Sequence, residues 1–306
     1  MSKEKLTIGI HDQLPAEHYH RADGVSSSTL KEMGRSPAHC KALMDGKRIK
    51  SSTALSTGTL LHTAVLEPDL FNTAYCKKPT TDGYPDALVS HDDYKAIASK
   101  LGLKLSGSKA DLKDRIKEAD KTALFFDDLS AEQSAGKTII SDSDWQLCQG
   151  VIQSVRLHDK ASKALSGGIA ERSVVWTDSI TQEKCKARFD YYREDLGIIF
   201  DLKTCQDARQ WAAQRDIHKY GYHISAAMYL AGAQAAGLPA TSFAWLFVEK
   251  EPPYAIGLYM ASPAMMEQGF IQFRTWLDQY HQCQQSGIWP GYASEFQTIE
   301  LPGYAA

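Results

Sequence analysis

The sequence predicts an α/β protein in which helices pack on a mixed β-sheet. Three short segments rich in β-branched and aromatic residues follow one another closely: ERSVVWT at 171–177, CKARFDYY at 185–192 and LGIIFDLKT at 196–204. A helical segment, two further strand candidates and a final helical segment come after them. This order of strands and helices is typical of a sheet covered by helices.

The composition is that of a globular protein. The chain has 306 residues, of which 43% are hydrophobic and 23% are charged, and its net charge is −3. This length fits about two domains, or one α/β domain with an insertion. The composition excludes a disordered, collagen-like or disulfide-stapled chain, and the charge excludes a uniformly basic nucleic-acid coat. A polyanionic partner would therefore need a local basic patch or bound metal ions.

The first part of the chain, residues 1–76, is expected to be helical. Ser28 is the expected N-cap of an early helix. The segment GTLLHTAVLEP at 58–68 has the i, i+4 spacing of a short amphipathic helix. This helix carries His62.

Residues 77–145 are expected to form an insertion. A loop is predicted over 77–93, and two short helices around a Gly-containing turn over 94–120. Eight basic and four acidic residues lie between Lys95 and Lys121, a local charge of +4 in an acidic chain.

The run LGLKLSGSKADLKDRI in this segment resembles a SAP-type DNA-binding motif. The resemblance implies that phosphates are held by backbone amides at the start of a helix and by four basic side chains. These are Lys104, Lys109, Lys113 and Arg115. The alternative is a solvated helical hairpin with ordinary surface lysines.

The third part, residues 146–306, is expected to form the core of the sheet. Its first three strands are joined by the hairpin-length connections DSITQE and RED, which predicts an antiparallel meander. One long helix is predicted from about Asp207 to Ala236. Two further strands, FAWLFVE and YAIGLYM, flank a KEPP turn, and a final helix is expected over about 263–285.

Three charged residues on consecutive strands form the candidate catalytic group. Side chains alternate along a strand, so Asp201 and Lys203 share a face, and a hairpin can bring Asp190 beside Asp201. Two neighbouring carboxylates repel, and their burial is costly unless they are paired. Mg²⁺ takes oxygen ligands and commonly accompanies phosphate substrates. The alternative is a surface Asp–Lys pair on an amphipathic strand.

Further features favour the catalytic interpretation. The apolar run before Asp201 indicates a buried central strand, Glu171 opens an earlier strand, and His62 lies on a separate helix. A metal ion would polarise phosphoryl oxygens and lower the pKa of a bound water. Lys203 could position or deprotonate that water and offset charge in the transition state.

The order of these motifs resembles the PD-(D/E)xK nuclease superfamily. The series GTLLHTAVLEP, AERSVVW, CKARFDYY, IIFDLKT and GYHISAAMYL is similar to the C-terminal nuclease domain of exodeoxyribonuclease VIII (RecE) and its phage relatives. It is similar, more distantly, to RecB-type nucleases and lambda exonuclease. The resemblance extends from about Ser26 to the C-terminal WPGY, apart from the insertion, and implies a restriction-endonuclease-like core.

The resemblance also implies a site for Mg²⁺, with Mn²⁺ as the alternative. Asp190 and Asp201 would be the metal-bridging carboxylates, and Lys203 would be the catalytic lysine.

Three further residues complete the implied site. His62 would be a metal ligand, Leu202 would offer its backbone carbonyl, and Glu171 would stand at the edge of the site. Taken alone, His62 favours the alternative of a hydrogen-bonded core histidine, whereas its GTLLH context favours the metal ligand.

One position departs from the related nucleases, which often carry a Q-x-x-x-Y motif on the helix after the lysine strand. The aligned residues here are Ser225 and Tyr229, so serine replaces glutamine. Serine is shorter, so a contact to the nucleotide is expected to be missing or mediated by water. Tyr222 or His223 could compensate, and the alternative role for Tyr229 is helix packing.

The implied activity is that of a metal-dependent exonuclease of phage or prophage recombination. Such an enzyme degrades the 5′-ended strand of linear duplex DNA, releases 5′-mononucleotides and leaves 3′ single-stranded tails. A single-strand annealing, RecT-like protein is the implied partner, and a ring-like homo-oligomer the implied assembly. A structure-specific or restriction-type endonuclease on the same fold and a non-catalytic DNA-binding scaffold are the alternatives.

The remaining sequence features favour a cytoplasmic protein of a bacterial host cell. The six cysteines have no spacing typical of a zinc or iron–sulfur site. The N-terminal MSKEKLTIGI lacks the apolar segment of a signal peptide, and no membrane span is expected.

Overall fold

The computed structural model describes residues 5–47 and 53–300. Its chain divides into two units, one made of Met1–Glu67 with Gly150–Ala306 and the other of Pro68–Gln149. The predicted insertion at 77–145 lies inside the second unit, which begins nine residues earlier and ends four residues later.

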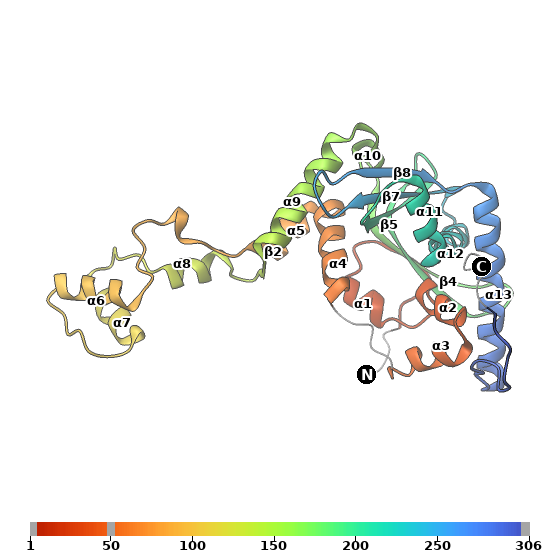
Figure 1. Ribbon diagram of the computed structural model, residues 1–306, viewed down its shortest axis with the longest axis horizontal. Coiled ribbons are helices and arrows are strands. Elements are labelled where there is room, and N and C mark those ends of the chain that lie inside the picture. The colour runs from red at the N-terminus through yellow and green to blue at the C-terminus, as the bar shows by residue number, and fades with distance from the viewer. Residues whose placement is uncertain (1–4, 48–52, 301–306) are drawn as a thin grey trace. The chain divides into compact units, whose positions relative to one another are not determined.

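A six-stranded sheet forms the centre of the first unit (Figure 1). Its order is β1-β4-β5-β6-β7-β8, and every neighbouring pair is antiparallel except β6 and β7. The predicted mixed sheet flanked by helices and the antiparallel meander are therefore confirmed. The strands are β1 (Gly9–His11), β4 (Ile169–Thr177), β5 (Lys184–Arg193), β6 (Ile198–Cys205), β7 (Ser242–Glu249) and β8 (Ile256–Met260).

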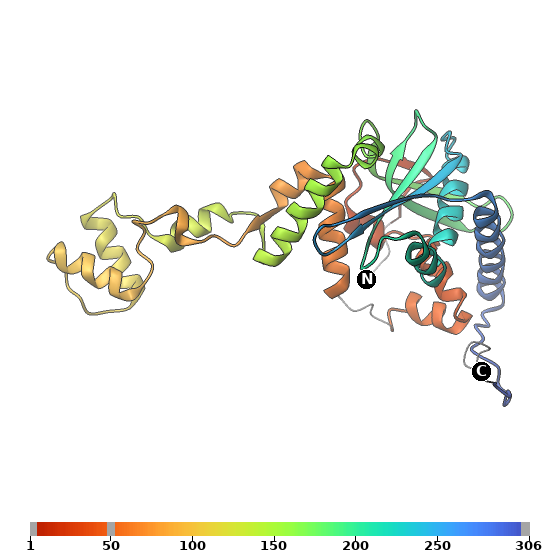
Figure 2. The ribbon, with the colours of Figure 1, turned by 45° about the horizontal axis from the view of Figure 1, so that its top comes forward.

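Helices pack around this sheet. Helix α12 packs against β4, β5 and β7 and is itself covered by α13 and α2, whereas α4 packs against β5 and β6. Figure 2 shows α13 as a long helix beside the sheet. The helices of this unit are α1 (Ala16–Arg21), α2 (Ser27–Met33), α3 (Pro37–Met44), α4 (Thr53–Leu66), α10 (Asp159–Ala164), α11 (Gln210–Lys219), α12 (Tyr222–Ala235) and α13 (Pro263–Ser286).

The core explains why these segments become strands. Side chains of β5, β6 and β7 that point toward α12, such as Phe189, Ile199 and Phe243, are fully buried with the apolar residues of α12. Because α12 is buried on most of its circumference, it reads as an apolar segment rather than an amphipathic one.

Two predictions of helix ends are wrong. The single helix expected over 207–236 is two helices, because Gly221 adopts a left-handed conformation with φ 61° between α11 and α12. The N-cap of α2 is Ser26 rather than Ser28, since the Ser26 side chain accepts the N–H of Thr29.

The second unit has its own small core. Five buried residues form it: Tyr94, Ala98, Leu112, Ile116 and Phe125. Its elements are α5 (Pro68–Ala74), β2 (Tyr75–Lys77), a 3₁₀ turn (Thr81–Gly83), α6 (His91–Lys100), α7 (Lys109–Ala119), α8 (Phe126–Gln133) and β3 (Thr138–Ile140). Helix α9 (Asp142–Leu157) contains the boundary between the units. Across the described residues, no helix has both the length and the apolar character needed to cross a bilayer.

Candidate active site

The candidate site lies where the regular pairing of β4, β5 and β6 is interrupted. The β4–β5 ladder omits the opposed residues Glu171 and Asp190. Glu171 has a left-handed backbone with φ 53°, which is uncommon for a residue with a Cβ and costs about 1–3 kcal/mol. On the other side, the Asp190 carboxylate accepts the N–H of Leu202 at 2.8 Å, where a regular ladder would use a backbone carbonyl. The interruption thus places both acidic side chains in one pocket.

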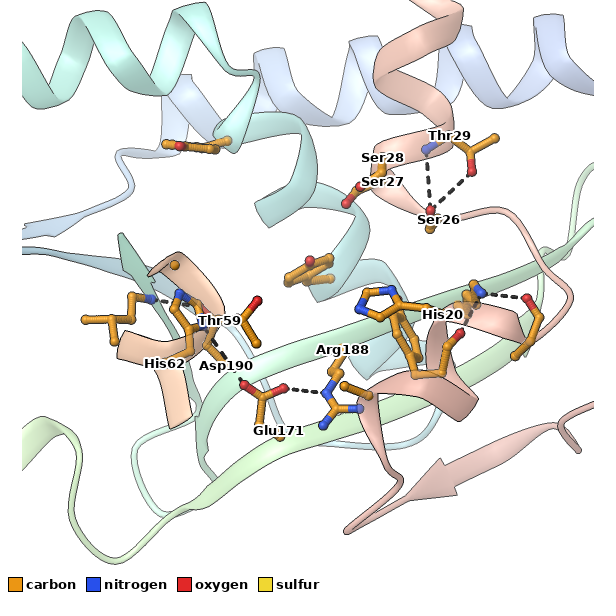
Figure 3. Close-up of a pocket in the computed structure, with 18 of the residues that line it drawn as sticks. His20, Ser26, Ser27, Ser28, Thr29, Thr59, His62, Glu171, Arg188 and Asp190 are labelled. Atoms are coloured by element: carbon orange, nitrogen blue, oxygen red, sulfur yellow. Dashed lines mark hydrogen bonds and ion pairs between the residues drawn. The ribbon is translucent and has the colours of Figure 1, made fainter. Parts of the chain in front are cut away.

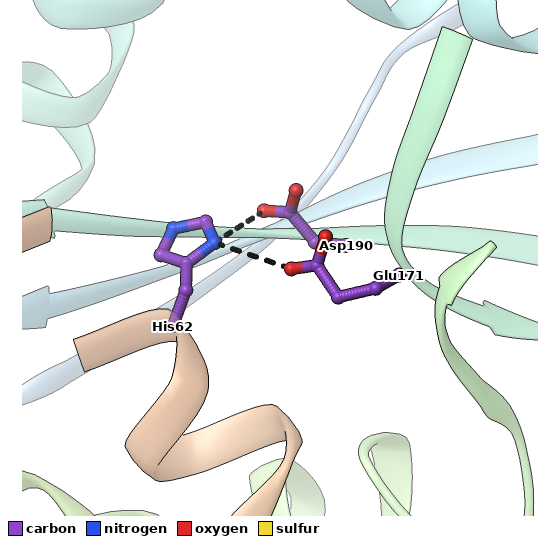
Figure 4. A group of neighbouring side chains, drawn as sticks. All are labelled: His62, Glu171 and Asp190. Carbon is purple, nitrogen blue, oxygen red and sulfur yellow. Dashed lines mark ion pairs between the residues drawn. The ribbon is translucent and has the colours of Figure 1, made fainter. Parts of the chain in front are cut away.

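Helix α4 adds an imidazole to these two carboxylates (Figure 4). The Nδ1 atom of His62 lies 3.6 Å from Asp190 Oδ2 and 4.0 Å from Glu171 Oε1. One ligand atom from each of the three residues lies within 4.8 Å of the others, the arrangement of a metal-binding cluster. His62 is therefore brought to the acidic residues as predicted, and Glu171 lies within the cluster rather than at its edge.

Lys203 and Asp201 form an ion pair beside this cluster. Lys203 Nζ lies 2.5 Å from Asp201 Oδ2 and 3.7 Å from Asp190 Oδ2. It also donates a hydrogen bond to the carbonyl of Leu202 at 3.3 Å. Asp201 is only 5% exposed, and its carboxylate faces the lysine. The structure thus brings all four predicted catalytic side chains together, with Asp201 paired to Lys203.

The balance of charge in the site favours a bound cation. Among the described residues, the carboxylates of Glu171, Asp190 and Asp201 have two permanent cations within ion-pair distance, Lys203 and Arg188. Arg188 donates to Glu171 and to the carbonyl of Leu14. Counting these permanent charges alone, the group carries one excess negative charge in a mostly buried position. Such an excess is unfavourable unless a cation offsets it.

The pKa shifts follow from this crowding. Burial and the Asp190 charge raise the pKa of Glu171, against the effect of Arg188. Burial alone would also raise the pKa of Asp190, but Lys203, His62 and the Leu202 N–H hold it below its usual range. Burial raises the pKa of Asp201 to about 6 despite the neighbouring lysine.

Lys203 is held in its charged form. Burial alone would lower the pKa of Lys203, but the carboxylates of Asp201 and Asp190 raise it well above its usual value. In this arrangement the charged lysine can stabilise negative charge that develops beside it.

These residues line one end of a pocket of about 720 Å³ (Figure 3). From His62, Asp190 and Glu171 the wall continues past Arg188 to His20 and to the hydroxyl side chains of 26–29. Lys186 also lines the pocket, and its ammonium group donates to the carbonyls of Tyr19 and Ala22. The pocket therefore joins an acidic cluster to a wall of basic and hydroxyl groups.

Sequence reasoning missed Arg188 as part of this site. Arg188 precedes Asp190 by two residues on β5, so alternation along the strand places both side chains on one face. That spacing was a usable signal. The left-handed backbone of Glu171 had no signal in the sequence, because glutamate rarely adopts it.

The predicted nucleotide-contacting residues of α12 differ in accessibility. Tyr222 and Tyr229 line the pocket, whereas Ser225 is 8% exposed and is not part of the lining. The Tyr229 ring also packs against Phe189 and Phe243, at centroid distances of 5.7 and 6.2 Å. Tyr229 thus combines access to the pocket with core packing.

In the second unit, acidic partners offset two of the four residues of the predicted basic patch. Lys109 Nζ lies 2.9 Å from Asp127, and Lys113 Nζ lies 2.7 Å from Asp128. The Arg115 guanidinium donates to the carbonyls of Lys104 and Ser106 and so fixes the turn before α7. Residues 68–149 contain 11 basic and 14 acidic residues, so the local +4 belongs to a unit with a net charge of −3.

Comparison with known proteins gives one family and one fold. Residues 26–302 match a family described as a PDDEXK-like domain of unknown function, DUF3799. The crystal structure of a candidate exonuclease from Eubacterium rectale superimposes with a TM-score of 0.53 at 14% identity, covering 95% of this chain and 96% of that one. A phage-related exonuclease from Haemophilus somnus gives a TM-score of 0.31 at 13% identity, over 64% of this chain and 95% of that one. No curated protein matches this sequence.

Proposed function

Because the chain belongs to the PDDEXK-like family DUF3799, we propose that it is a metal-dependent exonuclease that acts on double-stranded DNA. One observation carries the proposal: His62, Glu171 and Asp190 converge in a pocket that Lys203, the ion-pair partner of Asp201, also lines. Two carboxylates and an imidazole suit a hard divalent ion such as Mg²⁺ or Mn²⁺. When bound, such an ion supplies Lewis-acid activation of the phosphodiester and of water.

The side chains of this chain have separable roles in the proposed reaction. Glu171, Asp190 and His62 would hold the cation, and the carbonyl of Leu202, which accepts a hydrogen bond from Lys203, would be an additional oxygen. Lys203 offsets the charge that builds on the phosphoryl oxygens, because Asp201 keeps it protonated and fixes its position. Arg188 orients the Glu171 carboxylate from the opposite side.

The direction and setting of the activity are proposed from the resemblance to the exodeoxyribonuclease VIII group. The chain would degrade the 5′-ended strand, release 5′-mononucleotides and leave a 3′ tail for a single-strand annealing partner. It would act in the cytoplasm during phage or prophage recombination, as a ring-like oligomer around linear DNA. The name of the Eubacterium rectale structure supports the exonuclease part of this proposal.

We also propose that the α6–α7 hairpin contributes a weak contact to DNA phosphates. Lys104 is exposed in the turn that Arg115 fixes. The ion pairs of Lys109 and Lys113 with α8 limit what these two lysines add.

Digestion of labelled DNA tests the proposal. Linear duplex labelled at the 5′ or at the 3′ end is incubated with Mg²⁺ and the wild-type protein or the Asp190→Asn variant. We expect the wild type to release the 5′ label as mononucleotide and the variant to release almost none. Cutting of covalently closed circular DNA would instead indicate an endonuclease. Binding of DNA without any hydrolysis would indicate a scaffold.

A further inference from the structure

The break between α11 and α12 creates an aromatic surface next to the candidate site. In one continuous helix, residues two apart point in directions about 200° apart and do not face each other. The left-handed Gly221 instead brings Tyr220 and Tyr222 together, with ring centroids 5.6 Å apart and planes inclined by 30°. Gly221 is thus what stacks the two rings.

This pair runs from the catalytic lysine to the surface. Lys203 Nζ lies 5.2 Å from the centroid of the Tyr222 ring, and Tyr222 lines the pocket. Tyr222 is supported from the core by Phe247, at a centroid distance of 6.4 Å. The outer ring, Tyr220, is 47% exposed and has Lys219 Nζ 5.0 Å from its centroid.

An exposed tyrosine in this position has the properties of a nucleobase platform. Single-stranded nucleic acids bind where bases stack on aromatic rings and nearby cations follow the backbone. The pair supplies a ring outside the pocket, a second ring at its mouth and a lysine beside each. A base that is still paired and stacked within a duplex does not offer a free face to such a ring.

We propose that Tyr220 and Tyr222 form a stacking platform for an unpaired base of the DNA strand held at the metal site. This inference rests on the proposed nuclease function and adds the class of substrate end that the site accepts: a terminus whose last bases are unpaired. Tyr220 binds the base, and Gly221 positions the ring.

The test measures whether the tyrosine and a base are coupled. Binding of a short, 3′-fluorescein-labelled oligothymidylate is followed by anisotropy in EDTA, so that no metal-dependent cleavage occurs. The wild type is compared with Tyr220→Ala, and the strand is compared with strands carrying one abasic site at successive positions. We expect Tyr220→Ala to weaken binding of the intact strand by about 5- to 100-fold, the contribution of one stacked base.

The coupling distinguishes stacking from a structural role. At one position of the strand, removal of the base should weaken binding by the wild type by a similar factor. The same removal should have little further effect on binding by Tyr220→Ala. Tyr220→Phe keeps the ring and should bind as the wild type does, whereas Tyr220→Leu should not. Tyr292→Ala is the matched control, because Tyr292 is 72% exposed but lies beyond α13 in the chain.

Three results would overturn the platform. The first is an unchanged affinity of Tyr220→Ala for the intact strand. The second is that Tyr220→Ala loses the same affinity for the intact strand and for every abasic strand. The third is that it loses as much affinity for blunt duplex as for the single strand. If the wild type still hydrolyses linear DNA in any of these cases, the proposed function stands and only the platform falls. If the wild type neither binds nor hydrolyses DNA, both proposals fall.

Discussion

The two units of this chain use charged side chains in opposite ways. In residues 68–149, opposite charges meet at the surface, as in the pairs Lys109–Asp127 and Lys113–Asp128. In the first unit, the carboxylates of Glu171, Asp190 and Asp201 are gathered in one mostly buried cluster, where they pair with Lys203 and Arg188.

The backbone shows the same contrast. Helices α6 and α7 begin with complete capping boxes, in which a serine and an aspartate bond to each other's backbone N–H groups. Glu171, by comparison, has a left-handed backbone and leaves the ladder of β4 and β5. Exposed ion pairs of the kind found in residues 68–149 contribute little to stability. Backbone strain and buried charge, when found together, point to a candidate functional site.

The largest expected effect distinguishes a buried carboxylate of the candidate site from an ion-paired surface carboxylate of the second unit. Asp190→Asn should lower the rate of DNA hydrolysis about 10³-fold or more, since a metal ligand worth several kcal/mol in the transition state is lost. The melting temperature should fall only modestly, because Asn keeps an oxygen that can accept the Leu202 N–H but loses the attraction of Lys203 that holds the pKa of Asp190 low. The matched control Asp127→Asn in the second unit should keep full activity. Equal activities of the two variants would remove Asp190 from the site.

The second prediction concerns the small core of the inserted unit. Leu112 is fully buried among only four other core residues, so Leu112→Ala should destabilise this unit by about 2–5 kcal/mol. Amide hydrogen exchange should rise across α6 and α7 and stay unchanged in β5 and β6, because the two units have separate cores. Leu105→Ala, at a 43% exposed position, is the control and should change neither. A matching rise in β5 and β6 would show that the units unfold together.

The sequence was informative wherever a pattern was local. Each end of the five strand candidates between 171 and 260 lies within two residues of the end of an observed strand. His62 lies on the expected helix. Alternation along β6 correctly placed Asp201 and Lys203 on one face. Hydrophobic periodicity and side-chain alternation can be recognised from residues that are close together in the sequence.

The sequence was uninformative where the geometry depends on distant partners. The break at Gly221 was missed because glycine is tolerated inside helices and α12 is apolar on most sides. The charge of 95–121 suggested a phosphate grip, but the compensating Asp127 and Asp128 lie outside that window. The ion pair of Asp201 with Lys203, formed beside the Asp190 carboxylate, depends on side-chain positions that a local sequence pattern does not give.

A third prediction concerns a buried carboxylate of the first unit, that of Asp178, whose two oxygens both accept hydrogen bonds. Burial alone would raise the pKa of Asp178, but hydrogen bonds from Thr181 and Arg274 hold it below its usual value. A lowered pKa stabilises the fold above the unfolded pKa of about 3.9 and loses this contribution as pH falls through the folded pKa. Asp178→Asn should therefore cost about 2 kcal/mol of unfolding free energy at pH 7, the value of hydrogen bonds to a charged group.

The pH dependence identifies the charge as the cause. In urea titrations the difference between wild type and Asp178→Asn should be constant from pH 8 to pH 5 and shrink below about pH 4. The control is Asp195→Asn, because the Asp195 side chain is 57% exposed and its pair with Arg193 should contribute little at any pH. A difference that persists undiminished at pH 3 would mean that shape, not charge, stabilises this turn.

The smallest expected effect tests whether the inserted unit touches DNA at all. Lys104 is held outward by the turn that Arg115 fixes, whereas Lys109 is paired with Asp127. If Lys104 contacts one phosphate, Lys104→Gln should reduce the slope of log Kd against log salt concentration by about 0.9 for duplex DNA in EDTA. Lys109→Gln should change this slope less, because Lys109 is already paired with Asp127 and a phosphate would have to replace that partner. Equal slopes for both variants and the wild type would mean that the α6–α7 hairpin is a solvated surface that does not contact DNA. The DNA contacts would then lie in the first unit.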